Sequence, residues 1–139
     1  MATSDFGRSF EQLREILRPY EDRLLLKVDA AGAYALHAPF SAKWRRELYF
    51  AGTEITKSYV SFHLMPVYMF PDLLSGIPAE LKKRMQGKSC FNFKRVEPNL
   101  FGMLTELTRR SFERMGAEGW LLPEMPDARL LDVVLGTEG

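Results

Sequence analysis

Apolar residues at helical spacing mark the first element of the chain. One stripe of the segment 4–20 recurs at intervals of three and four residues, which is the pattern of an amphipathic helix. Ser4 or Asp5 suits the start of this helix, and Pro19 marks its end. The stripe consists of Phe6, Phe10, Leu13, Ile16 and Leu17.

Apolar runs typical of β-strands follow in two pairs. The runs Leu24 to Val28 and Ala33 to Ala38 flank a short turn that contains glycine, and they predict a β-hairpin. The runs Glu47 to Phe50 and Lys57 to Tyr68 form a second pair, which we expect to be joined through Gly52. Antiparallel strand pairing is therefore predicted for this half of the chain.

The run from Lys57 to Tyr68 alternates between apolar and polar positions. Because successive side chains of a strand point to opposite faces, one face is expected to be apolar and the other polar. Pro66 has no N–H to donate, so the pairing is expected to loosen there or the strand to lie at an edge. The apolar set is Val60, Phe62 and Leu64, and the polar set is Tyr59, Ser61 and His63.

Proline and glycine residues divide the following segment into shorter elements. A turn of helix is predicted over Pro71 to Ser75, then a helix that begins at Pro78 and ends before Gly87. A strand is predicted over Lys88 to Lys94, and a long helix from about residue 98 to residue 116.

This order of elements predicts an α+β fold. Successive hairpins give a mainly antiparallel sheet, and two long amphipathic helices need one face of that sheet to cover. We therefore expect a two-layer sandwich with the helices packed on one face. With 139 residues and a 46% hydrophobic composition, the chain has the size of a single domain, residues 1–139.

Net charge and cysteine content limit the kinds of partner, metal site and cellular compartment that we expect for this protein. The formal net charge of +1 supplies no global field toward nucleic acid or an anionic membrane. The single cysteine, Cys90, excludes an internal disulfide and a multi-thiolate metal site, and it fits a reducing compartment. The first ten residues lack the basic start and apolar run of a signal peptide, and no segment approaches about 18 apolar residues, so we expect neither a signal peptide nor a membrane span. We expect a cytoplasmic protein with no membrane or nucleic-acid partner and no cofactor.

One triplet, Gly87-Lys88-Ser89, matches part of a phosphate-binding loop. Such a loop needs a second glycine five positions earlier and lies between a strand and a helix. Here Lys82 stands at that position, and the triplet leaves a predicted helix and enters a predicted strand. We interpret Gly87 as the end of the helix and Lys88 as the start of the strand.

Cys90 and the two histidines are the candidates for catalysis or metal binding. Cys90 could be a nucleophile with His63 as its base if their strands are neighbours, and a cysteine that only packs is the alternative. One cysteine with His37 and His63, and no paired carboxylates beside them, does not make a zinc site. The leading prediction is therefore no catalytic residue and no metal site.

The polar sides of the two central strands supply candidate ligand-binding residues. Hydroxyl, imidazole, amide and ammonium groups on a shared face could bind a small polar or anionic ligand. The same pattern is typical of the solvated side of an antiparallel sheet, or of a side that the tail or a partner chain covers, and these alternatives stay open. The candidates are Lys57, Tyr59, Ser61, His63, Lys88, Cys90 and Asn92.

Large apolar side chains outside the predicted elements indicate surfaces that need cover from the protein itself or from a partner. Trp44, Trp120 and the apolar run Leu130 to Leu135 could close the polar face or seal an interface. The possible partners are therefore a small molecule, a protein, or a second copy of the chain in a homodimer.

The succession of an alternating strand, short helices, a glycine-led strand and a final helix resembles the YdhG-like family of small bacterial proteins. The resemblance covers about residues 45 to 115, and its glycine-led strand pattern, G-K-x-x-x-x-F, is matched by Gly87, Lys88 and Phe93. It implies a compact α+β sheet with helices on one side, similar to frataxin-like iron chaperones.

The resemblance also bears on function, because some YdhG-like relatives are described as intracellular iron chaperones. That activity uses exposed carboxylates, and here the first helix offers Glu11 and Glu15, with Glu21 and Asp22 just beyond. The leading hypothesis is a binding or interaction module without enzymatic activity. An enzyme that uses Cys90 or His63 and an iron chaperone are the alternatives.

Overall fold

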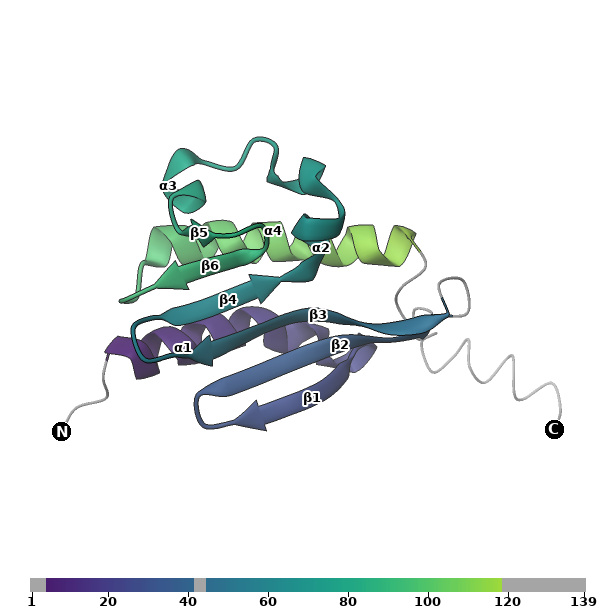
Figure 1. Ribbon diagram of the computed structural model, residues 1–139, viewed down its shortest axis with the longest axis horizontal. Helices are drawn as coiled ribbons and strands as arrows, with labels where there is room; N and C mark the ends of the chain where they lie inside the picture. The colour runs from purple at the N-terminus through teal and green to yellow at the C-terminus, as the bar shows by residue number, and fades with distance from the viewer. Residues whose placement is uncertain (1–4, 42–44, 119–139) are drawn as a thin grey trace, which may run out of the picture.

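The computed structural model describes residues 5–41 and 45–118 (Figure 1). In these residues six strands form one sheet, and every neighbouring pair is antiparallel. The strands are β1 (Leu25–Ala30), β2 (Ala33–Ser41), β3 (Arg46–Ile55), β4 (Val60–Leu64), β5 (Met85–Gln86) and β6 (Cys90–Phe93). Their order across the sheet is β1-β2-β3-β4-β6-β5.

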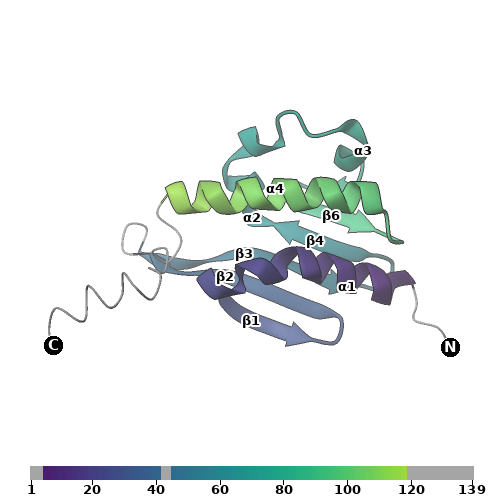
Figure 2. The same cartoon turned by 180° about the vertical axis from the view of Figure 1, so that it is seen from behind.

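The helical elements fall into two groups. The long helices are α1 (Asp5–Leu17) and α4 (Pro98–Ala117), and the short elements are α2 (Met65–Met69), α3 (Ala79–Lys82), η1 (Arg18–Arg23) and η2 (Pro71–Leu74). Figures 1 and 2 show α1 and α4 side by side on one face of the sheet, while the segment from α2 to α3 runs along the β5–β6 edge. No helix of the described residues covers the other face, which we call the open face. The expected α+β sandwich of two layers is confirmed.

Alternation along β4 and β6 builds the core between the two layers. Phe62 and Phe91 are completely buried and lie opposite each other in the register of the two strands. Leu13 of α1 and Leu104 of α4 are also completely buried. Burying one such side chain contributes about 1.5–3 kcal/mol, so this layer dominates the stability of the fold. The predicted alternation is confirmed for β4, whose Val60, Phe62 and Leu64 are buried.

The prediction that Gly52 joins two strands is wrong. Gly52 lies inside β3, which runs without a break past it and pairs with both β2 and β4. The turn comes later, between Ile55 and Val60, where the Thr56 side chain accepts a hydrogen bond from the Tyr59 N–H. A glycine within a strand is tolerated here because another side chain lies directly over it.

The strand predicted over Lys57 to Tyr68 is shorter than expected. Lys57, Ser58 and Tyr59 belong to the turn before β4, and the residues after Leu64 form α2. Pro66 lies in the first turn of this helix, where its missing N–H costs nothing. The proline therefore ends the strand by starting a helix, and β4 lies inside the sheet, not at its edge.

The helix predicted from Pro78 to Gly87 is also wrong in its second half. The helix α3 ends at Lys82, and Met85–Gln86 forms the short edge strand β5. Gly87 has a φ of 79° in the turn between β5 and β6, so it serves a strand connection and not a helix end. The strand predicted over Lys88 to Lys94 shortens to Cys90–Phe93.

The first helix, the first hairpin and the last helix form close to where the sequence places them. Trp44, Trp120 and the apolar run Leu130 to Leu135 lie outside the described residues. None of the described helices combines the length and the apolar character that crossing a bilayer demands.

We expect Gly52→Ala to lower the free energy of unfolding by about 1–3 kcal/mol. A β-carbon at this position would lie 2.6 Å from the Tyr34 carbonyl oxygen and 2.2 Å from the Tyr49 hydroxyl, so the backbone must shift. Urea unfolding followed by circular dichroism measures the change.

Gly102→Ala is the matched control, because Gly102 lies inside α4 with no atom near an added β-carbon. This substitution is expected to raise the free energy of unfolding by about 0.5–1 kcal/mol. Equal effects of the two substitutions would contradict the close approach at Gly52.

Candidate functional site

The polar residues of β4 and β6 lie together on the open face. The two strands are neighbours, with His63 opposite Cys90 and Ser61 opposite Asn92. All four side chains are half-buried, while the residues that alternate with them are buried beneath the helices. Packing on the helix side thus decides which polar groups meet on the open side.

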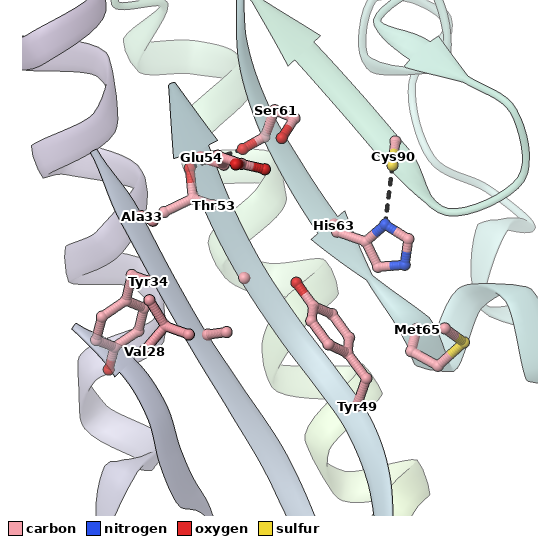
Figure 3. Close-up of a pocket in the computed structure, with 12 residues that line it drawn as sticks. Val28, Ala33, Tyr34, Tyr49, Thr53, Glu54, Ser61, His63, Met65 and Cys90 are labelled. Carbon is pink, nitrogen blue, oxygen red and sulfur yellow. Dashed lines mark hydrogen bonds between the residues drawn. The ribbon is translucent and has the colours of Figure 1, made fainter. Parts of the chain in front are cut away.

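A hollow of about 540 Å³ lies on this face beside His63 and Cys90. We call it the sheet-face depression, and Figure 3 shows the side chains around it. Its floor is formed by small residues on β2 and β3, which leave space above the sheet. The residues that line it include Ala33, Ala35, Gly52, Tyr49, His63 and Cys90.

His63 contacts two side chains of the neighbouring strand segment. Its Nδ1 atom lies 2.9 Å from the Cys90 sulfur, and its Nε2 atom lies 3.1 Å from the Ser89 hydroxyl oxygen. Ser89 is buried, and its carbonyl oxygen accepts a hydrogen bond from the Leu64 N–H, which holds the start of β6 against the end of β4. Both imidazole nitrogens are therefore engaged, and the ring orientation is fixed.

Burial keeps this pair of groups neutral. It lowers the pKa of His63 below 6.5 and raises the pKa of the Cys90 thiol above its usual value. An imidazole and a thiol are thus in contact near neutral pH, without a resting thiolate–imidazolium ion pair. In this state His63 is able to accept a proton from the thiol when Cys90 reacts.

Tyr49 lies next to this pair. Its ring meets the His63 ring edge-on at 5.0 Å between centroids, and its hydroxyl lies directly over Gly52. Burial, followed by the nearby Cys90 and Glu54, raises the pKa of Tyr49, so its hydroxyl stays protonated. In the described part of the chain this hydroxyl has no hydrogen-bond partner, which leaves it available as a donor to a ligand.

A bulge in β3 brings Tyr49 to this position. In the register with β2, Leu36 pairs with Ala51 and His37 pairs with Tyr49, so Phe50 is an extra residue. Phe50 and Ala51 are both completely buried. Tyr49 consequently faces the open side immediately before the bulge, and Gly52 faces the same side after it.

Tyr59 and Asn92 line a different hollow at the β5–β6 end of the sheet. It measures about 520 Å³ and is also lined by Lys83, Lys94 and Arg95, and we call it the basic depression. The Asn92 side-chain carbonyl oxygen is buried there without a hydrogen-bond partner among the described residues. Five of the seven predicted site residues are thus divided between two hollows, with Ser61, His63 and Cys90 at the sheet-face depression and Tyr59 and Asn92 at the basic depression.

Lys57 and Lys88, which were also predicted as site residues, line neither depression. Both are exposed, and the Lys88 ammonium lies 6.0 Å from the centre of the Tyr68 ring. Their positions follow from the shortened strands, because both residues fall in turns where the alternation of a strand no longer applies.

Sequence reasoning missed Tyr49, Ser89 and Ala35. Ser89 precedes β6, outside the strand alternation, and its hydroxyl contacts His63. Tyr49 and Ala35 lie on strands that were predicted without a face assignment. The unusual glycine within an apolar strand, Gly52, was the signal that could have indicated a bulge or a close contact there.

Metal ligands do not gather in the described residues, which contain no cluster of three or more histidine, cysteine or carboxylate groups able to hold an ion. The carboxylates at the end of α1 are engaged otherwise. Glu15 and Glu21 both pair with Arg18, and Glu21 also accepts a hydrogen bond from the Tyr34 hydroxyl.

Comparison of the chain with protein-family models, curated proteins and solved structures finds no match in any of the three. The resemblance to the YdhG-like family therefore stays a prediction.

The lowered pKa of His63 predicts that the folded state loses stability on mild acidification. The unfolded chain takes up a proton at this position as the pH falls through about 6.5, while the folded protein resists protonation. The melting temperature of the wild type should therefore fall between pH 7.5 and pH 5.5, and it should fall less for His63→Asn.

His37→Asn is the control, since His37 lies on the same face and this variant retains His63. Its melting temperature should still fall over the same interval. If His63→Asn loses as many degrees as the wild type, burial of a neutral His63 is not what makes the fold sensitive to acid.

Proposed function

We propose that this protein is a binding module that holds a small, largely apolar molecule with a hydrogen-bond-accepting oxygen in the sheet-face depression. The observation that carries the proposal is a floor of small side chains beside a row of hydrogen-bonding groups. Ala35 and Gly52 leave the space, and Tyr49, His63 and Cys90 border it. A concave, mostly apolar surface with a few convergent polar groups is typical of ligand sites.

The size and chemistry of the depression support this class of ligand. Its volume of about 540 Å³ lies within the usual range for small-molecule sites. Val28, Ala33 and Met65 add apolar surface, and Glu54 is the charged residue among the described residues that line it. A carboxylate at the rim disfavours an anion, so a neutral ligand fits better here.

The predicted ligand was small and either polar or anionic, and an anionic one would suit the basic depression better. Lys83, Lys94 and Arg95 border that hollow together with Tyr59 and Asn92, and a fourth cation there, Arg84, is paired with Glu97. Exposed cations of this kind attract anions only modestly at physiological salt. We therefore base the proposal on the sheet-face depression, whose polar groups are better buried.

Filling the floor of the depression tests the proposal. Ala35 pairs with Gly52 on the open face, so Ala35→Leu places a larger side chain in the space without changing the core. A set of neutral cyclic ketones, including cyclohexanone, is titrated into the ¹⁵N-labelled full chain and followed by NMR. We expect shifts around Tyr49 and His63, and at least tenfold weaker binding to Ala35→Leu.

Ala79→Leu is the matched control, because Ala79 is exposed on α3, away from the depression. It should bind the ketones as the wild type does. Shifts that are spread over the whole surface, or binding that Ala35→Leu leaves unchanged, would refute the sheet-face depression as the site.

A further inference from the structure

Four groups of different chemistry meet at one side of the sheet-face depression. Cys90 supplies a thiol, His63 a neutral base in contact with it, Ser89 a hydroxyl on the far side of the imidazole, and Tyr49 a phenol without a hydrogen-bond partner among the described residues. Binding of a ketone-like molecule would use Tyr49 alone. The other three side chains are linked by contacts that non-covalent binding does not require. An inference about their role rests on the proposed function.

We propose that Cys90 forms a covalent bond with an α,β-unsaturated carbonyl compound bound in the sheet-face depression. The geometry that supports this is a nucleophile and base 2.9 Å apart, at the border of a hollow that is open to a ligand. The proposal deepens the function above by naming the class of ligand and the reaction that it undergoes.

The addition balances without a further reactant. The Cys90 sulfur forms a bond to the β-carbon of the ligand while the carbon–carbon π bond breaks, and the electron pair moves toward the carbonyl oxygen. His63 accepts the thiol proton at Nδ1 and returns it to the α-carbon, so the base is regenerated. The product is a thioether that contains every atom of the ligand.

Ser89 and Tyr49 support different stages of this step. The Ser89 hydroxyl accepts a hydrogen bond from His63 Nε2 when the ring carries both protons, so Ser89 is a positioning residue for the base. The Tyr49 hydroxyl is a donor for the carbonyl oxygen on which negative charge develops. Because Tyr49 lies over Gly52, the register partner of His63, the donor and the base belong to neighbouring strands.

Addition fits the available groups better than acyl transfer does. An addition needs one base and one donor for the carbonyl oxygen, and His63 and Tyr49 provide them. Acyl transfer needs, in addition, space for a departing group, which His63 would have to protonate in place of the α-carbon. The two reactions give products of different mass, so experiment separates them.

The experiment measures adduct formation on the full chain with 2-cyclohexen-1-one as the probe. Intact-mass spectrometry is expected to show a gain equal to the whole enone on the wild type and no gain on Cys90→Ala. Rates are measured in parallel with iodoacetamide, whose reaction with a thiol develops no charge on a carbonyl oxygen. The enone rate divided by the iodoacetamide rate should be larger for the wild type than for N-acetylcysteine by about tenfold or more.

Variants assign the roles of the neighbouring groups. Tyr49→Phe should return the rate ratio to that of N-acetylcysteine while leaving the iodoacetamide rate unchanged. Ser89→Ala should slow both reactions, and Ser89→Thr, which keeps a hydroxyl, should restore them. Circular dichroism melting of each variant identifies any loss of fold, and Tyr59→Phe, in the turn before β4 and outside the sheet-face depression, is the control for a lost phenol.

Three results, besides the absence of any adduct on the wild type, would overturn the inference. They are a rate ratio equal to that of N-acetylcysteine, a Tyr49→Phe variant with an unchanged ratio, and a mass gain smaller than the enone. Titration of Cys90→Ala with cyclohexanone, the saturated analogue, separates the two proposals. Binding without adduct formation on the wild type refutes the covalent step alone, while the absence of ketone binding refutes the proposed function as well.

Discussion

Burial of the aromatic faces of β4 and β6 beneath α1 and α4 is the interaction on which the rest of the structure depends. Phe62 and Phe91 point into this layer, and a strand cannot turn one residue inward without turning the next outward. His63 and Cys90 are therefore held on the open face by the energy of the core. A one-residue slip of either strand would bury polar groups and expose aromatic rings, so the register is strongly specified.

The bulge in β3 places a tyrosine side chain where regular strand alternation would not. An uninterrupted alternation would place Tyr49 and Ala51 on one face, whereas the extra residue Phe50 allows Phe50 and Ala51 to be buried together. The phenol of Tyr49 then lies over Gly52, beside His63. The position of the Tyr49 hydroxyl over the floor of the depression, beside His63, is in this way the product of one irregularity in one strand.

The electrostatic character of the open face changes along its length. Near Cys90 the groups are neutral, because burial lowers the pKa of His63 and raises the pKas of Cys90 and Tyr49. At the β5–β6 end, Lys83 and Lys94 border a separate hollow. A single polar face as defined by sequence alternation thus contains two environments, and they favour different ligands.

The sequence by itself determined the two-layer α+β architecture, the first and last helices, and the presence of His63 and Cys90 on one face of the sheet. The reason is that apolar periodicity shows which side of each element is buried. The tertiary structure alone decided the contact between His63 and Ser89 and the placement of Tyr49. These depend on a bulge, on the strand order and on a turn at Gly87. Such features arise from pairing between segments far apart in the chain, which no local pattern of residues encodes.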